Sequence, residues 1–178
     1  MGNHSSSASL IQRIQNRLFA IPAVAQWWAG RFASRARSSP DGPIPFVRLG
    51  KPLHACTAAL ITTGGVHLRS QPPFDMQDPD GDASLRQIPG DVALADLTIT
   101  HDYYNHSSAD QDLNVIFPLQ RFRELVERGV LGRVAPHHFG LMGHMEGEHL
   151  RRLQEETAPE IAAKLRADGV DFAFLTPA

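Results

Sequence analysis

The chain of 178 residues contains one cysteine and no large excess of either charge. A single cysteine, Cys56, excludes an internal disulfide and any zinc site built from clustered cysteines. A formal net charge of −2 and a pI near 6.5 provide no general field for holding polyphosphate, so we expect no nucleic-acid partner. Cys56 has no cationic neighbour in the sequence to activate its thiol, which favours a packing role over that of a nucleophile.

Long apolar runs are also missing. No window reaches the roughly 18 uninterrupted apolar residues that a membrane-spanning helix requires. The early segment lacks a compact apolar run that ends in a small-residue cleavage site, so a secretory signal is not predicted either. We therefore expect a cytoplasmic protein.

Residues 1–45 are predicted to form a helical arm and a linker. From Leu10 to about Arg35 the apolar residues recur at helical spacing, and Pro22 divides this stretch into two pieces. The proline-rich segment Ser38–Pro45 cannot continue a helix. Basic residues alternate with the apolar ones, and this pattern favours a helix that covers a partner or the domain itself over one that lies on a membrane. The arm is thus a candidate for contacts in a homo- or hetero-oligomer.

Residues 46–178 are predicted to form one α/β domain. Two helices alternate with short apolar strands, and strand–helix–strand repeats imply a short parallel sheet with helices on its faces, of the Rossmann-like or flavodoxin-like kind. The predicted strands are 58–63, 97–100, 132–135 and 172–176, and the predicted helices are 118–128 and about 148–167.

The span from Gly64 to Asp96 is predicted to be an ordered excursion over the edge of the sheet. It is rich in proline, aspartate and glycine, and it carries apolar residues that could anchor it, such as Phe74 and Ile88. Its acidic run over 78–82 could suggest a calcium loop, but the later glutamate of such a loop is missing, and a solvated turn is favoured.

Histidines follow three of the predicted strands. Ligands bind outside the carboxyl ends of strands in open parallel sheets, so the residues that follow each strand are the ones to examine. A paired-glycine turn and a histidine follow the first strand, two histidines lie in the loop after the second, and two more come directly after the third. These histidines, His67, His101, His106, His137 and His138, are therefore expected along one edge of the sheet.

Imidazole titrates near neutral pH and can transfer a proton or hold an anion, which makes such a cluster a candidate site. The expected proton-handling residues are His101, His106 and His138, and the expected substrate-binding residues are Gly64, Gly65, His67, Arg86 and His137. Arg86 could pair with a substrate carboxylate through its guanidinium group, and the glycine pair allows close approach of the backbone.

Other uses of these residues remain open. Any single histidine could serve structure alone, and two of them with a nearby aspartate could bind a metal. Their spacing matches no defined zinc or iron signature, so we expect no metal and no bound cofactor. The glycine pair lacks the spacing of a dinucleotide-binding fingerprint, so NAD is not predicted.

Six blocks of the sequence resemble a known family, the selenoprotein B subunits of glycine, sarcosine, betaine and D-proline reductases. The resemblance extends from about Phe46 to the end of the chain. The blocks are Leu60–His67, Gln71–Asp75, Gly81–Pro89, His101–His106, Asp112–Leu119 and Ala135–Gly143.

The resemblance implies reductive cleavage of the C–N bond at the α-carbon of glycine, betaine, sarcosine or a proline-like substrate. It also implies partner subunits or a thiol reductant, and a selenocysteine or cysteine nucleophile in the loop after a strand such as 172–176, beyond Ala178.

Two explanations compete for the end of the sequence at Ala178. The domain could be incomplete at its C-terminus because a UGA selenocysteine codon was read as a stop, or the chain could be a shortened relative. We favour the first, so the chain is expected to be a reductase subunit, possibly a truncated reading of one. The alternatives are a catalytically inactive ligand-binding or regulatory subunit of the same fold and, second, a metal-dependent hydrolase.

Overall fold

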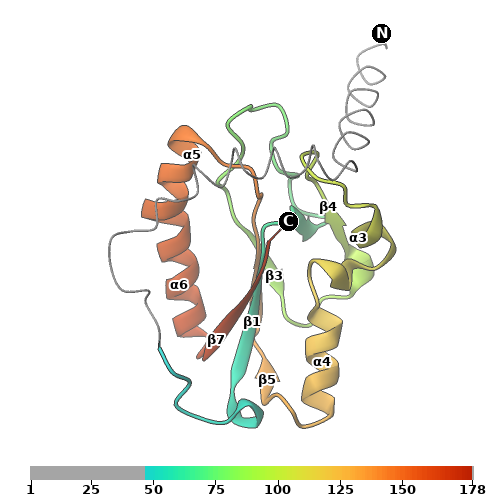
Figure 1. Ribbon diagram of the computed structural model, residues 1–178, viewed down its shortest axis with the longest axis vertical. Coiled ribbons are helices and arrows are strands. Elements are labelled where there is room, and N and C mark those ends of the chain that lie inside the picture. The colour runs from blue at the N-terminus through green and yellow to red at the C-terminus, as the bar shows by residue number, and fades with distance from the viewer. Residues whose placement is uncertain (1–46, 178) are drawn as a thin grey trace, which may run out of the picture. The chain divides into compact units, whose positions relative to one another are not determined.

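The computed structural model describes residues 47–177, and the arm predicted over residues 1–45 lies outside them. Residues from Arg48 onward form a compact unit of strands and helices (Figure 1). The strands are β1 (Thr57–Thr62), β2 (Val66–Leu68), β3 (Arg86–Pro89), β4 (Leu97–Ile99), β5 (Arg133–Val134), β6 (His137–Gly140) and β7 (Phe172–Thr176). The α-helices are α3 (Ser107–Gln111), α4 (Leu119–Glu127), α5 (Gly147–Arg152) and α6 (Ala158–Ala167). Short 3-10 turns, η1 (Leu53–Ala55), η2 (Leu94–Asp96) and η3 (Leu113–Val115), precede β1, β4 and α4.

The main sheet is built around β1. β7 pairs with β1 in parallel on one side, while β5 and β6 pair with it in parallel on the other side. β3 completes the sheet by pairing antiparallel with β6. Five of the six residues of β1 are buried, as expected for a parallel strand that is covered on both faces. The predicted α/β class with a mostly parallel sheet is confirmed.

Helices cover both faces of this sheet, with α4 on one side and α6 on the other (Figure 1). The predicted apolar face of α4 packs against Ala58 of β1 and against Cys56, which precedes that strand. On the opposite side, Ile161 of α6 packs with Phe139 of β6. Cys56 is fully buried, and its Sγ lies 3.4 Å from the carbonyl oxygen of Pro52, so its predicted packing role is confirmed.

The second predicted strand does not belong to the main sheet. Residues 97–99 form β4, which pairs antiparallel with β2 in a separate two-stranded sheet. The excursion over 64–96 supplies both β2 and β3, and its predicted anchors Phe74 and Ile88 are buried. The prediction missed these strands because three or four residues carry too little periodicity to stand out.

The third predicted strand does not end at residue 135. It breaks at Ala135 and Pro136, since proline has no N–H to donate to a ladder, and then continues as β6. We call residues 135–136 the strand break. As a consequence, His137 and His138 lie within a strand. Their predicted place in the loop after the strand is wrong.

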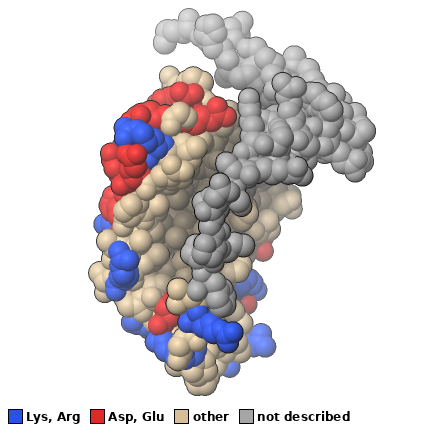
Figure 2. All heavy atoms as spheres, turned by 60° about the vertical axis from the view of Figure 1, so that its left-hand side comes forward, with Lys and Arg blue, Asp and Glu red and all other residues tan. Residues whose placement is uncertain are grey.

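The helix predicted over 148–167 is present, but it is not uniform. A π-helical turn, η4 (Leu153–Thr157), joins α5 to α6, and Pro159 lies in the first turn of α6. Within η4, the Thr157 hydroxyl donates a hydrogen bond to the Ala83 carbonyl oxygen at 2.9 Å. Alternating charges form ion pairs along the exposed side of this helix, including Arg151 with Glu155 (Figure 2). Among the helices of residues 47–177, none has the length and apolar character needed to cross a membrane.

Candidate functional site

Three loops meet where β1, β4 and β6 end. The Gly65 N–H donates to the Leu141 carbonyl oxygen at 2.9 Å, and the Thr100 N–H donates to the Gly65 carbonyl oxygen at 2.9 Å. A third bond runs from the Gly143 N–H to Nε2 of His101 at 3.0 Å. We call these loops, residues 63–65, 100–106 and 141–144, the carboxyl-end rim.

His101 lies at the centre of the rim and is 3% exposed. Both of its ring nitrogens face backbone N–H groups, that of Gly143 at 3.0 Å and that of Tyr103 at 3.3 Å. A neutral imidazole has one acceptor nitrogen, so the shorter contact assigns the lone pair to Nε2 and the proton to Nδ1. Burial, followed by the proximity of His144, lowers the pKa of His101 to about 4. His101 is therefore neutral at neutral pH.

The paired-glycine turn is held by Tyr104. The Tyr104 hydroxyl donates to the Gly64 carbonyl oxygen at 3.0 Å, and burial raises the pKa of Tyr104 to about 12, so the phenol keeps its proton. Gly65 has a φ of 71°, and a side chain there would overlap the Thr100 carbonyl oxygen. The N–H groups of the pair bond within the protein, to Thr62 Oγ1 at 3.1 Å and to Leu141 O at 2.9 Å.

His106 lies at the open side of the rim, before α3, with its side chain one-third exposed. Its Nδ1 lies 2.8 Å from Oδ2 of Asp110, and its ring contacts that of Tyr104 with centroids 5.6 Å apart. Among the described residues, Nε2 of His106 has no hydrogen-bond partner. A histidine with one nitrogen on a carboxylate and the other available is arranged for proton transfer.

His67 lies behind the rim, on β2, and is 3% exposed. Its Nδ1 lies 2.8 Å from the Leu68 carbonyl oxygen and its Nε2 lies 2.8 Å from Oγ1 of Thr100, so both nitrogens are engaged within the protein. Burial lowers the pKa of His67. The contact with Thr100 joins β2 to the loop that follows β4.

Arg86 also lies at this end of the sheet, since it is paired with Gly140 at the end of β6. Its guanidinium group stacks over Phe74 at 4.3 Å from the ring centroid. Four hydrogen bonds hold it in place, to the carbonyl oxygens of Pro72, Pro73 and Leu85 and to the hydroxyl of Ser84. Arg86 thereby ties the Pro72–Pro73 segment to β3.

His137 and His138 lie away from the rim, because β6 carries them back into the sheet. Nδ1 of His137 lies 2.9 Å from Oδ2 of Asp168, the residue that follows α6. His138 is fully buried, and its Nδ1 accepts a hydrogen bond from the Leu60 N–H at 3.0 Å. Its other nitrogen, Nε2, is buried without a partner. Burial lowers the pKa of His138 to about 4.

The structure thus brings together most of the predicted site residues, namely Gly64, Gly65, His67, Arg86, His101 and His106, and separates His137 and His138 from them. Sequence reasoning did not select Tyr104, Gly143 or His144, although all three lie in the loops that it examined. His144 stacks on Tyr103 with ring centroids 4.4 Å apart, which gives the rim an exposed aromatic edge.

Acidic residues of the excursion make internal turns. Oδ1 of Asp78 accepts the Asp80 N–H, and Oδ1 of Asp82 accepts the N–H and hydroxyl of Ser84. Over residues 47–177, no three or more histidine, cysteine, aspartate or glutamate side chains converge as a metal site would require.

Comparison with known proteins identifies the family. The family model for glycine/sarcosine/betaine reductase selenoprotein B matches residues 43–178. The chain is 37% identical, over 71% of its length, to the D-proline reductase subunit gamma of Acetoanaerobium sticklandii. Over the same share it is 30% identical to the betaine reductase complex component B subunit beta of Peptoclostridium acidaminophilum. It is also 27% identical to the glycine reductase complex component B subunit gamma of Carboxydothermus hydrogenoformans, again over 71% of its length.

The matched region is a part of each relative. It covers 50% of the D-proline reductase subunit and 29% of each of the other two. No solved structure matches the chain. The family model nevertheless covers every residue that the structure describes, and the chain belongs to the glycine/sarcosine/betaine reductase selenoprotein B family.

Proposed function

We propose that this chain forms the substrate-side part of a reductase subunit that cleaves the C–N bond of a small amino-acid-like substrate such as glycine, betaine, sarcosine or proline. Two observations support the proposal. The relatives are named as subunits of D-proline, betaine and glycine reductases. In addition, the loops after three strands converge on the carboxyl-end rim, where open parallel sheets bind their ligands. The convergence of these loops is the observation that carries the proposal.

The reaction needs a nucleophile, and the proposal places a selenocysteine or cysteine on polypeptide that follows β7. The selenol or thiol is ionised because its pKa is low, and the ionised chalcogen attacks the α-carbon. The nitrogen leaves with the electron pair of the C–N bond as a neutral amine, and the α-carbon is then bonded to the chalcogen. One thiolate of a dithiol reductant attacks the chalcogen, the carbon–chalcogen bond breaks, and the α-carbon takes up a proton. The second thiol displaces the chalcogenolate, so the thiol pair ends as a disulfide and supplies the two electrons.

In this proposal, His106 supplies the proton that the α-carbon takes up when the carbon–chalcogen bond breaks. Its side chain is one-third exposed and has a carboxylate partner, Asp110, at 2.8 Å. His101 and Tyr104 act as positioning residues, since they bond to the backbone of Gly143 and Gly64 and hold the rim in one shape. Arg86 and His67 support the loops of the rim through their contacts with the backbone and with neighbouring side chains.

The DNA that follows the codon of Ala178 provides the first test. The proposal expects an in-frame UGA or cysteine codon followed by further coding sequence, and a run of stop codons would contradict it. The protein encoded by the extended frame is then assayed for amine release or ring opening with glycine, betaine, sarcosine and D-proline in the presence of dithiothreitol.

Two variants of the extended protein sharpen this assay. His106→Asn is expected to lower kcat at least about tenfold while KM changes little, because general acid catalysis contributes about 10²–10⁴-fold. His54→Asn, at an exposed histidine of η1, is the control and keeps the wild-type rate. Substrate binding without any turnover would support an inactive binding subunit instead. Turnover that depends on one bound metal per chain would support a hydrolase.

A further inference from the structure

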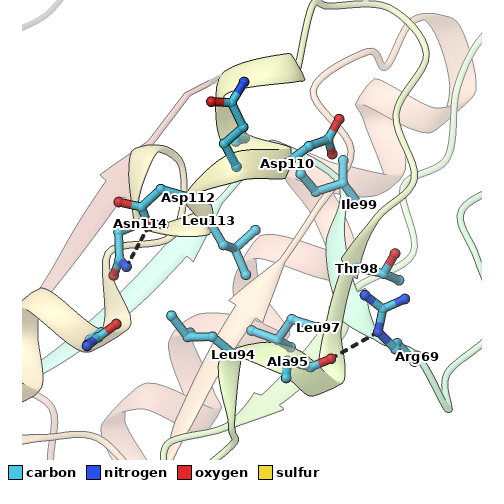
Figure 3. Close-up of a pocket in the computed structure, with 13 residues that line it drawn as sticks. Arg69, Leu94, Ala95, Leu97, Thr98, Ile99, Asp110, Asp112, Leu113 and Asn114 are labelled. Carbon is cyan, nitrogen blue, oxygen red and sulfur yellow. Dashed lines mark hydrogen bonds between the residues drawn. The ribbon is translucent and has the colours of Figure 1, made fainter.

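A groove runs beside β4, outside the carboxyl-end rim. It has a volume of about 370 Å³ and lies between β4 with the preceding η2 and the segment from α3 to η3 (Figure 3). Three consecutive residues of β4, Leu97, Thr98 and Ile99, line it, whereas β2 contributes none. Because consecutive side chains of a strand point to opposite faces, a cavity that touches all three lies along the edge of β4 that faces away from β2. We call it the β4-edge groove.

The backbone of β4 is unpaired along this edge. The hydrogen bonds that flank the short ladder, at Asp96 and Thr100, show that the even-numbered residues of β4 face β2. Leu97 and Ile99 therefore turn their backbone groups toward the groove. The Leu97 N–H donates to the first residue of η2. Over residues 47–177, the Leu97 carbonyl oxygen and both backbone groups of Ile99 have no hydrogen-bond partner. A strand edge of this kind can bind an extended peptide as an added strand.

A cation lies at the start of β4. Nε of Arg69 donates to the Ala95 carbonyl oxygen at 3.0 Å, which fixes the direction of the guanidinium group (Figure 3). In the part of the chain that the structure describes, no acceptor bonds to the two Nη atoms, so their N–H groups are available to a ligand. A guanidinium group held in this way can bind a carboxylate through two parallel hydrogen bonds.

The side of the groove opposite β4 is acidic. Asp110 and Asp112 line it, and Figure 3 shows Asp112 across the groove from Arg69. Oδ1 of Asp112 accepts hydrogen bonds from the side-chain amide and the backbone N–H of Asn114, and these bonds lower the pKa of Asp112. Asp110 is already paired with His106 at 2.8 Å. Among the described residues Oδ2 of Asp112 has no such partner, so this carboxylate is available to a cation.

Apolar side chains form the floor between the two charges. Leu94, Leu97 and Leu113 lie between Arg69 and Asp112 in the close-up (Figure 3). Leu97 is nearly fully buried, so the floor belongs to the core and has a fixed shape. A peptide residue that lies on this floor therefore needs an apolar side chain.

We propose that the β4-edge groove binds the carboxyl-terminal segment of a partner polypeptide, which adds to β4 as an antiparallel strand. The last residue of the segment lies beside Leu97 and donates to its carbonyl oxygen, with the terminal carboxylate on Arg69. The residue two places earlier lies opposite Ile99 and exchanges both backbone hydrogen bonds with it. These two residues share one face of the added strand, so the last one is apolar and the earlier one is a lysine or arginine that reaches Asp112.

The free strand edge distinguishes a polypeptide from a small ligand. A single amino acid could pair with Arg69 and Asp112, but it would leave the backbone groups of Ile99 without partners. The inference also goes beyond the proposed function, because none of the residues predicted as site residues lines the groove and docking requires no nucleophile.

Isothermal titration calorimetry and amide NMR of the full chain test this proposal. The probe is the acetylated pentapeptide Ala-Ala-Lys-Ala-Leu with a free carboxylate, and three matched peptides each remove one interaction. One ends in a carboxamide, one carries a methyl group on the amide nitrogen of its lysine, and one has glutamate in place of lysine. We expect each to bind at least about tenfold more weakly than the probe, which should shift the amide resonances of Leu97 and Ile99.

Two variants locate the charges of the ligand. Arg69→Gln is expected to weaken binding of the probe about tenfold and to leave binding of the carboxamide peptide unchanged, a difference that a general loss of structure would not produce. Asp112→Asn keeps a side-chain oxygen for Asn114 and should abolish the preference for lysine over glutamate. Arg128→Gln removes an exposed charge outside the groove and should leave binding of all four peptides unchanged.

Four results would overturn the proposal: no binding of the probe, equal binding of the carboxamide peptide, equal binding of the N-methylated peptide, or binding of free leucine as tight as that of the probe. Resonance changes confined to the carboxyl-end rim would also overturn it. The reductase assay of the extended protein is independent of these measurements. Peptide binding in the groove of a protein without reductase activity would establish the docking site and refute the proposed function alone.

Discussion

The carboxyl-end rim contains one buried histidine, His101, and a second, His138, lies in β6 just after the strand break; the two differ in what surrounds them. His101 and His138 both accept a hydrogen bond from a backbone N–H, and burial lowers the pKa of both to about 4. Around His101 lie the exposed Tyr103 and the partly exposed His106. His138 is surrounded by β1 and by Phe117, and the ring centroids of His138 and Phe117 lie 5.9 Å apart. A buried, neutral imidazole therefore does not by itself identify a site of chemistry, and the exposure of its neighbours distinguishes the two cases.

Beside the strand break, the imidazole of His138 replaces a backbone carbonyl group as a hydrogen-bond acceptor. β1 pairs with β5 at Thr57 and Ala58 and with β6 at Ile61 and Thr62, so the Leu60 N–H faces the interruption. Nδ1 of His138 accepts that N–H in place of a carbonyl oxygen. This bond makes Nε2 the protonated nitrogen, and its N–H lacks a buried acceptor.

The largest effect should come from pH, because it acts on both histidines together. Their folded-state pKa values lie below the unfolded value of 6.5, so their contribution to stability is complete above pH 6.5 and is lost as the pH falls toward 4. Protonation should cost about 3 kcal/mol at His138 and, with solvent screening near the rim, about 2 kcal/mol at His101. Urea denaturation at pH 7, 5.5 and 4 measures the loss. A free energy of unfolding that is constant over this range would contradict both assignments.

Removal of the His138 side chain should have the next largest effect. His138→Ala leaves the Leu60 N–H without its acceptor and opens a cavity in the core, so we expect a loss of about 3 kcal/mol in the free energy of unfolding. Chemical denaturation at pH 7 provides the measurement. His54→Ala, at an exposed histidine, serves as the control and should change stability by less than about 0.5 kcal/mol. Equal effects of the two substitutions would remove the structural role assigned to His138.

His101→Ala should cost less and should act locally. We expect a loss of about 2 kcal/mol, since a single backbone N–H loses its acceptor beside partly exposed loops. Hydrogen exchange at the Gly143 amide should accelerate in His101→Ala. In His138→Ala, the exchange rate of this amide should equal the wild-type rate after correction for global stability. If both variants accelerate exchange at Gly143 equally, the rim and the strand break form one cooperative unit and the comparison fails.

Tyr104→Phe should give the smallest effect of the series. It removes one hydrogen bond, from the hydroxyl to the Gly64 carbonyl oxygen, and keeps the ring contacts with His101 and His106. We expect a loss of about 1 kcal/mol. Thermal unfolding followed by circular dichroism can resolve this change. A loss as large as that of His138→Ala would mean that the phenol supports more of the rim than the Gly64 turn.

Much of the fold could be predicted because its long elements carry clear periodicity. β1, β7 and α4 were found within one or two residues, since each has a strong apolar pattern or a cap such as Gly129. The short strands were missed or misassigned, because the pairing of β4 with β2 is decided by contacts distant in the sequence. For the same reason the continuation of β6 past Pro136 was not predicted.

The candidate site was predicted less completely than the fold. Strand-end loops identified Gly64, His101 and His106, which do lie together. Arg86 was singled out for the chemistry of its side chain, but the partners of that side chain, the carbonyl oxygens of Pro72 and Pro73 among them, depend on the path of the excursion. That path is a tertiary property, and no local pattern encodes it.

The order of strands along the chain bears on how the protein is made. β1 lies at the centre of the main sheet, yet its partners β5, β6 and β7 all follow it in the sequence. During synthesis on the ribosome, β1 emerges long before any of them, and one of its apolar edges stays unpaired until Phe172–Thr176 has left the exit tunnel. Completion of the main sheet is therefore delayed until nearly all of these residues have been translated, and a nascent chain stalled before β7 would expose that edge to chaperones.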